Sequence, residues 1–409
     1  MPILKNFKKE INNLDKYLFI TFVFFIISGG IMNTLSNKTY LNDSWTIGEW
    51  LINYQGGFVR RGFIGEIIYI LASSTRISPI FIIWLISISS YYLLVKLTII
   101  EARNKVSSIF LLSPGVFLAP IIGDFLIRKD LLLLLIFMIS LKVLRLKNPN
   151  FIYLNLLNIS GILIHESFAI YALPIQIFIV SNKYNLFKKN YYKLLKLLPS
   201  FCLFICCFIF KGDQNQAISI HQSWLSKSFL FPYENLNNEL PLGAINAIGW
   251  GFKDVFKIFI NAFTDFRGIL WVPLAWLATI FVLASFFLGD YSGKDVKIKS
   301  FILSFQFLPF SVLCFSGWDY GRWIFIWILS SVLIYCTFGD QIKSYKPIQT
   351  NIFRYDLIEE YLLNIEIHKR SKVLLAIFAY PHCCWSLYYL PGLLIVPIYS
   401  LIRSLKSFF

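Results

Sequence analysis

Charged residues are scarce in this sequence of 409 residues: Asp, Glu, Lys and Arg make up 15% of it, against about 25% in ordinary soluble domains. Long polar stretches and low-complexity linkers are absent, and the seven cysteines include no CxxC pair. Hydrophobic residues instead make up 57% of the chain, where about 45–50% is usual. These features exclude a water-soluble fold, a coiled coil, a disordered tail and a disulfide scaffold.

The hydrophobic residues fall in blocks, many of them long enough to cross about 30 Å of hydrocarbon as helices. We therefore predict an all-α polytopic membrane protein with about 12 transmembrane helices (range about 10–13) and interfacial helices in its outer loops. The whole chain, 1–409, is expected to form one integral-membrane domain. The predicted spans are 17–35, 78–97, 107–123, 130–146, 151–164, 167–181, 195–211, 268–289, 300–316, 321–338, 373–387 and 388–404.

The net charge of +16 follows this predicted topology. Lysines precede the first span, which indicates a cytoplasmic N-terminus, and an even number of spans returns the C-terminus to the same side. On this topology the whole positive excess lies in cytoplasmic segments, as the positive-inside rule expects. The basic composition therefore reports orientation in the cell (inner or plasma) membrane, and we expect no nucleic-acid partner.

The same rule decides two ambiguous stretches. We interpret 151–181 as two short spans that meet at His165-Glu166, because a single crossing would place the following lysines outside. The apolar residues of 242–263 have helical spacing with lysines on the opposite side, which predicts an interfacial helix. The other non-spanning segments are the first outer loop 36–77 with an interfacial helix at 63–74, the largest outer segment 212–267 and the largest cytoplasmic segment 339–372.

The first outer loop carries two acids, Asp43 and Glu49, and then an arginine pair, Arg60-Arg61, flanked by glycines. Glycine lets the backbone approach a ligand closely, and two guanidiniums suit a phosphate or pyrophosphate. The alternative is that the arginines reach out to lipid headgroups. An arginine pair on the outer face runs against the positive-inside bias, which favours the functional interpretation.

Three further groups of charged residues end or interrupt apolar blocks on the same predicted face. They are Asp124 with Arg128 and Lys129, His165 with Glu166, and Asp319 with Arg322. A charge at the membrane boundary is costly and marks a candidate functional site, and a histidine beside a carboxylate suits acid–base work. The structural alternatives are a solvated turn for the first group, a hydrogen bond between helices for the second and an internal ion pair for the third.

Acids, a histidine and arginines from separate spans thus converge on one outer face above an apolar bundle, where a substrate with a phosphate and a lipid tail would fit. This layout resembles the GT-C class of integral-membrane glycosyltransferases. The resemblance implies transfer of a sugar from a polyprenyl-phosphate donor to a glycan, lipid or protein acceptor at the extracytoplasmic face. It assigns Asp43 as the key carboxylate and Arg60 or Arg61 as phosphate ligands. The candidate catalytic residues are then Asp43, Glu49, His165 and Glu166, and the candidate substrate-binding residues are Arg60, Arg61, Asp124, Arg128, Lys129, Asp319 and Arg322.

Two alternatives stay open, a surface-polysaccharide polymerase of the O-antigen type and a transporter or flippase of lipid-linked glycans. The segment 212–267 contains a single arginine, Arg267, which argues against the Arg-rich outer loop of a polymerase. The charges lie at span ends and no internal repeat is present, which argues against a transporter. No cofactor is indicated, and because the acids show no clustered ligand spacing, a divalent metal has no support in the sequence.

Overall fold

The computed structural model describes residues 45–102, 105–106, 108–111, 115–122, 125–184, 192–227, 240–251, 253–254, 256–257, 260–261, 286, 296–315 and 319–342. Within these residues the chain is 79% helical and contains no strand, which confirms the all-α class for this part of the protein. The predicted spans 17–35, 373–387 and 388–404, and all of 268–289 except Phe286, lie outside the described residues.

Three of the described helices are long and apolar enough to cross a membrane. They are α6 (Pro79–Glu101), α18 (Val296–Phe315) and residues Gly321–Ile342 of α19 (Tyr320–Ile342). They contain 23, 20 and 22 residues, and about 20 suffice to cross the hydrocarbon. Several apolar side chains of α6 are more than half exposed, as lipid-facing side chains would be. The chain therefore has the helices of a membrane protein.

Four other helices match predicted segments closely. They are α5 (Gly62–Thr75), α9 (Asp130–Arg145), α10 (Phe151–Ile164) and α11 (Ser167–Lys183). The side chain of Asn150 caps α10 by accepting two backbone N–H groups of its first turn. Helix α10 ends before His165-Glu166 and α11 begins after it, so the predicted break is present. A side chain at Gly161 would overlap the ring of Phe168, so glycine lets the two helices pack closely beside the break.

Two predicted spans are interrupted. In place of one helix over 107–123 the described residues form α7 (Ser108–Leu111) and α8 (Ala119–Ile122), with turns at 115–118. The sequence between them contains Pro114-Gly115, and both residue types disfavour a continuous helix. The predicted span 195–211 is divided into α12 (Tyr192–Leu195) and α13 (Leu198–Ile209), with a proline in the first turn of α13.

The prediction of a continuous helix over 242–263 is wrong for the described residues. After α15 (Gly243–Asn246) and the 3₁₀ turn η3 (Ala247–Gly249), the backbone is not helical at Trp250 and Gly251. The N–H of Gly251 donates to the Asp254 carboxylate at 2.8 Å, an interaction that starts a new helical segment. Two glycines close together therefore outweigh the helical spacing of the apolar residues.

The chain divides into two compact units, which we describe separately. Unit 1 comprises Met1–Ser36, Val95–Phe125 and Lys257–Phe409, and unit 2 comprises Asn37–Leu94 and Leu126–Phe256. In unit 1, α18 and α19 pack along each other, with Trp327 Nε1 donating to the Leu303 carbonyl at 2.9 Å. The Lys299 ammonium of α18 is buried and lies 4.4 Å from the centre of the Phe286 ring and 4.9 Å from that of Tyr335.

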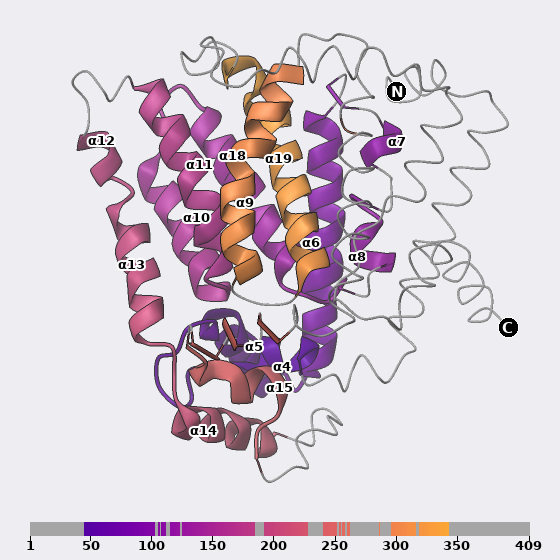
Figure 1. Cartoon of the computed structure of the whole chain (residues 1–409). Coiled ribbons are helices and arrows are strands. Elements are labelled where there is room, and N and C mark those ends of the chain that lie inside the picture. Colours follow the sequence, from indigo (N-terminus) through magenta and orange to yellow (C-terminus); the bar gives the residue numbers. More distant parts are fainter. Residues whose placement is uncertain are drawn as a thin grey trace, which may run out of the picture. The chain divides into compact units, whose positions relative to one another are not determined.

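In unit 2, α10 packs against α9, α11 and α13. The shorter helices α4 (Thr46–Leu51), α5, α14 (Gln214–Leu225) and α15 lie together at one end of this bundle (Figure 1). Trp224 of α14 donates from its indole Nε1 to the Leu51 carbonyl at 2.7 Å, which joins α14 to the end of α4. The end layer thus combines segments from before and after the bundle helices in the sequence.

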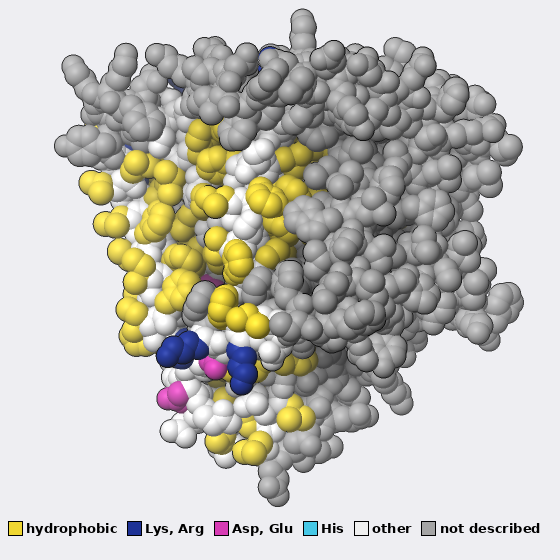
Figure 2. Space-filling view, viewed as in Figure 1, with side chains coloured by type: hydrophobic (Ala, Val, Ile, Leu, Met, Phe, Trp, Pro, Cys, Tyr) yellow, Lys and Arg dark blue, Asp and Glu magenta, His cyan; other side chains and the backbone are white. Residues whose placement is uncertain are grey.

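Hydrophobic side chains cover much of the visible described surface, and a group of Lys, Arg, Asp and Glu side chains lies near the end where α14 is found (Figure 2). On α10 the exposed apolar residues include Ile152 and Leu156, and on α13 they include Ile205 and Ile209. Such large exposed apolar faces need a non-aqueous neighbour. These faces agree with the membrane-protein character that the three long apolar helices indicate.

A buried polar triad links the bundle helices of unit 2. Gln176 of α11 donates to Ser140 of α9 at 3.0 Å and exchanges hydrogen bonds with Asn158 of α10 at 2.7 and 3.0 Å. We expect Gln176→Leu to lower the free energy of unfolding by about 1–3 kcal/mol, because it removes both hydrogen bonds of the buried Asn158 amide with Gln176 and the one that Ser140 accepts. Thermal unfolding in detergent checks this, with Gln222→Leu on the exposed face of α14 as the control. Equal stability of the two variants would contradict the prediction.

Candidate functional site

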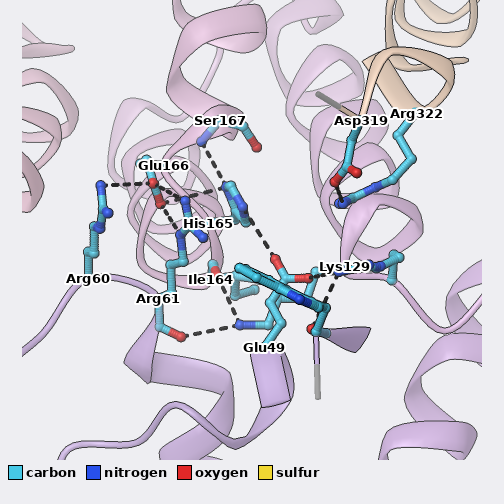
Figure 3. Close-up of polar contacts among 12 residues, drawn as sticks. Glu49, Arg60, Arg61, Lys129, Ile164, His165, Glu166, Ser167, Asp319 and Arg322 are labelled. Carbon is cyan, nitrogen blue, oxygen red and sulfur yellow. Dashed lines mark hydrogen bonds and ion pairs between the residues drawn. The ribbon is translucent and has the colours of Figure 1, made fainter. Parts of the chain in front are cut away.

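Seven of the eleven predicted site residues gather in unit 2, at the end of the bundle where α4 and α5 lie (Figure 3). Glu49 is on α4, and the arginine pair 60–61 directly precedes α5. Residues 128–129 directly precede α9, and residues 165–166 form the break between α10 and α11. Except for Glu49, which lies within the short helix α4, each of these residues therefore lies directly beside a helix end.

Close packing of α5 on α4 brings the arginine pair to this place. A Cβ at Gly65 would overlap the carbonyl oxygen of Ile52, so only glycine allows the first turn of α5 to lie against the end of α4. Trp50 Nε1 donates to the Ile127 carbonyl at 2.5 Å, which fixes the segment before α9 beside α4. Glycine contacts and one buried indole thus assemble residues from distant parts of the sequence.

Arg61 and Glu166 form a bidentate ion pair across 105 residues of sequence. Arg61 Nε donates to Glu166 Oε2 at 2.8 Å, and Arg61 Nη2 donates to Oε1 of the same carboxylate. Arg60 Nη1 lies 3.3 Å from Glu166 Oε1, and Arg60 Nη2 donates to the carbonyls of Ile248 at 3.3 Å and Trp250 at 3.0 Å. Both guanidiniums are thereby held on one carboxylate.

The backbone of Arg61 is in the left-handed region, with φ of 67°. For a residue with a side chain this conformation costs about 1–3 kcal/mol and is found where the surrounding structure enforces it. Here the side chain is held by Glu166, and the carbonyl accepts a hydrogen bond from Lys129 Nζ at 3.2 Å. The strain is thus located at the residue that joins the carboxylate to the lysine.

Glu49 is the second buried carboxylate. Arg128 Nη1 donates to its Oε2 at 3.3 Å, and its Oε1 lies 3.3 Å from His165 Nε2. The N–H of Ser167 donates to His165 Nδ1 at 3.1 Å. Nδ1 is therefore an acceptor, which places the proton of the neutral imidazole on Nε2, facing Glu49. Burial, and next the positive charge of Arg61, lower the pKa of His165, which favours this neutral form.

The Glu166 carboxyl is held in its charged form. Burial by itself would raise the pKa of Glu166, but the positive charges of Arg61 and Arg60, together with the hydrogen bond from Arg61, outweigh burial and hold the pKa well below its ordinary value. Its side chain is 10% exposed, whereas that of Arg61 is 28% exposed. The cluster therefore has a buried anionic part and a more accessible guanidinium at its edge.

Lys129 is fully buried and donates from Nζ to the carbonyls of Arg61 at 3.2 Å and Ile164 at 3.3 Å. Burial lowers its pKa to about 8. We expect affinity for an anionic ligand to fall as the pH rises above about 8, because the site then loses one positive charge. The folded lysine releases its proton at lower pH than the unfolded one. Between about pH 8 and 10.5 the unfolded chain therefore binds more protons, and the free energy of unfolding rises with pH.

Binding measurements at pH 7, 8 and 9 on the wild type and Lys129→Arg test this prediction. Arginine keeps its charge throughout this range, so the variant should lose the decrease in affinity above pH 8. An identical pH dependence in both proteins would contradict it. A thermal unfolding series over the same pH range provides the second readout.

Positive charge is in excess at this site. Arg60, Arg61, Arg128 and Lys129 supply four positive charges, and Glu49 and Glu166 supply two negative ones. The neighbouring Asp130 is also buried and acidic, so among the described residues of the site the basic side chains outnumber the acidic ones by one. A site with more basic than acidic side chains suits an anionic ligand.

The other predicted site residues are not part of this cluster as described. Asp43 and Asp124 lie outside the described residues. Asp319 and Arg322 belong to unit 1, where Arg322 Nη1 donates to Asp319 Oδ2, as the structural alternative expected. Among the described residues no three His, Cys, Asp or Glu side chains are placed to bind a metal ion.

Sequence reasoning missed the groups that position the charged residues. These are the Trp50 indole, the Ser167 N–H and the carbonyls of Ile164, Ile248 and Trp250. Trp50 directly follows the candidate residue Glu49, and this position in the sequence could have indicated that its indole helps to build the site. A backbone donor or acceptor has no signal in a sequence, because every residue type except proline carries the same groups.

Comparisons with known proteins add no assignment: no family model, no curated protein and no solved structure matches this chain.

Proposed function

We propose that this protein is a membrane glycosyltransferase that moves a sugar from a polyprenyl-phosphate donor to a glycan, lipid or protein acceptor. In this proposal the chain crosses the cell membrane about 12 times, with both termini cytoplasmic. The end of unit 2 that carries the charged cluster then faces the extracytoplasmic side. The likeness of the sequence layout to the GT-C class supports the proposal.

The observation that carries the proposal is the set of four basic side chains around two buried carboxylates, at the end of an apolar bundle. A lipid-linked phosphate needs positive charge for its headgroup and an apolar surface for its tail. The exposed apolar faces of α10 and α13 supply the second requirement in the same unit. Arginine suits the phosphate because its planar fork matches phosphate oxygens.

In the proposed reaction, an acceptor hydroxyl oxygen forms a bond to C1 of the sugar while the bond from C1 to the phosphate oxygen breaks. The bonding electrons move to the phosphate, whose developing charge is stabilised by Arg60, Arg61 and Arg128. The acceptor proton passes to a carboxylate, a contribution worth roughly 10²–10⁴-fold in rate. No further reactant is needed to balance the reaction.

Glu49 and Glu166 are better suited to position cations than to take this proton. Both side chains are at least nine-tenths buried, and each is engaged by basic or imidazole groups. His165 is engaged at both ring nitrogens. We therefore assign these three residues as positioning residues and keep Asp43, the residue that the resemblance implies, as the proposed base.

The test is the profile of lipid-linked and surface glycans in a deletion strain complemented with the wild type, Asp43→Asn or the double variant Arg60→Ala/Arg61→Ala. We expect one sugar to be missing from the deletion strain and restored by the wild type alone. If the deletion strain loses a ladder of chain lengths instead of one sugar, the protein would be assigned as a polysaccharide polymerase and this proposal would be wrong. Unchanged glycans in the deletion strain would exclude both and favour transport.

A further inference from the structure

Two tryptophans from distant segments meet beside the charged cluster. The rings of Trp45, before α4, and Trp250, after η3, pack edge to face with centroids 5.7 Å apart and planes at 61°. Trp45 is 43% exposed and Trp250 is half-buried. Both residues belong to unit 2, the unit that contains the cluster.

The backbone carbonyls of these tryptophans contact two of the three guanidiniums of the cluster. The Trp45 carbonyl accepts from Arg128 Nη1 at 3.4 Å, and the Trp250 carbonyl accepts from Arg60 Nη2 at 3.0 Å. Arg128 contacts Glu49, whereas Arg60 contacts Glu166. The residues that carry the paired indoles therefore each contact one arginine of the proposed phosphate site through the backbone.

We propose that Trp45 and Trp250 form the subsite for the sugar ring of the donor, an inference that rests on the proposed function. C1 of that sugar is bonded directly to a phosphate oxygen, so its ring must lie next to the guanidiniums that hold the phosphate. One face of a pyranose carries mainly C–H groups, and an indole is a large flat surface on which such a face can be buried. The exposed part of Trp45 offers that surface.

An alternative role for the two tryptophans is to anchor the protein in the membrane interface, but this role does not need all the contacts that they make. An interfacial tryptophan needs an apolar body at headgroup depth and a wet polar edge. It needs no edge-to-face partner from a segment about 200 residues away, and no carbonyl bond to an arginine of a charged cluster. The combination of ring packing and arginine contacts therefore favours a ligand subsite.

The experiment compares two ligands on the full-length protein in nanodiscs. One is undecaprenyl phosphate, and the other is a panel of undecaprenyl-phosphate-linked glucose, galactose and mannose. Native mass spectrometry or a binding titration measures the affinity for each lipid. The preference ratio is the affinity for the sugar-linked lipid that binds most tightly, divided by the affinity for bare undecaprenyl phosphate. For the wild type we expect a ratio of roughly tenfold, in line with the burial of one aromatic face.

Trp45→Ala and Trp250→Ala should each bring this ratio close to one and leave the affinity for bare undecaprenyl phosphate within about twofold. Trp45→Phe keeps an aromatic face and should retain a clear preference, whereas Trp45→Leu keeps only apolar bulk and should lose it. Phe81→Ala, which removes an aromatic side chain that is 58% exposed on α6, is the matched control and should behave as the wild type.

The outcomes separate the two proposals. If the wild type binds bare undecaprenyl phosphate, and binds none of the sugar-linked lipids more tightly than that, the sugar subsite is overturned and the phosphate site stays intact. A preference for the sugar-linked lipid that survives in Trp45→Ala and Trp250→Ala would also overturn the sugar subsite. If these two variants lose sugar transfer but keep that preference, the two tryptophans would instead bind the acceptor. Failure of the wild type to bind either class of lipid would overturn the proposed function itself.

Discussion

Replacing Arg61 with alanine is expected to reduce sugar transfer by roughly 10²–10³-fold, the usual effect of removing one preorganised charge-stabilising donor. Arg61 has the most exposed side chain among the three clustered arginines, with 28% exposed against 14% for Arg60 and 12% for Arg128. It is therefore the guanidinium best placed to meet a ligand from outside. Arg61→Lys should restore only part of the activity, because an ammonium cannot bind a phosphate in the bidentate manner.

The chain contains a matched control for this substitution. Arg76, at the end of α5, also has a left-handed backbone, with φ of 59°, but its side chain is exposed. Arg61→Gly and Arg76→Gly both relieve backbone strain. Transfer should be lost only in the first variant, measured as incorporation of labelled sugar in membranes. Full activity of Arg61→Gly would show that Arg61 has no role in the reaction.

Substituting Glu166 with alanine is expected to lower the free energy of unfolding by about 3–5 kcal/mol, the usual effect of removing one partner of a buried ion pair. The variant leaves the guanidiniums of Arg60 and Arg61 without the carboxylate that both contact. Thermal unfolding in detergent measures the loss. Glu66→Gln on α5 is the control, because its contacts with the Tyr54 N–H and Gln55 are less buried.

A double-mutant cycle keeps this prediction testable even if Glu166→Ala folds poorly. Adding Arg61→Met to Glu166→Ala removes one uncompensated charge, so the double variant should be more stable than Glu166→Ala alone. Strictly additive losses would show that the pair is not energetically coupled. Such a result would contradict the geometry of the bidentate contact.

The same carboxyl predicts a pH dependence. The pKa of Glu166 in the folded protein lies well below its ordinary value. The stabilisation that Glu166 provides is therefore fully present above the pKa of the unfolded carboxyl, about 4.5. It is lost as the pH falls below that value toward the folded pKa. Wild type should lose stability in acid more steeply than Glu166→Gln, and parallel curves for the two proteins would contradict this.

Local patterns predicted much of the helical structure. The apolar block before His165-Glu166 and the block after it became α10 and α11 with nearly the expected bounds. Helix α5 also formed where the spacing after the arginine pair indicates a helix. The interruption at Trp250 was not predicted, because the apolar spacing on both sides of Gly249 and Gly251 looked continuous. A hydrophobic pattern records the preferred face of a helix but not whether glycines end it.

The partners of the charged residues could not be predicted in the same way. Asp319 and Arg322 lie three residues apart, so their pairing was foreseen as one of two interpretations. Glu166 lies 105 residues from Arg61, and Glu49 lies 79 residues from Arg128. Nothing in either local sequence selects the partner. That choice depends on how α4, α5, α9 and the α10–α11 break pack together.

The sequence by itself determined that this is a helical protein with membrane-crossing segments, and where its charged residues end the apolar blocks. These properties follow from composition and from spacing within single helices, which a linear pattern records directly. Only the tertiary structure decided that Arg60 and Arg61 share Glu166, and that two tryptophans meet beside them. The physical reason is that ion pairs and ring contacts act over a few ångströms in space. Close helix packing, permitted here by Gly65, creates that proximity.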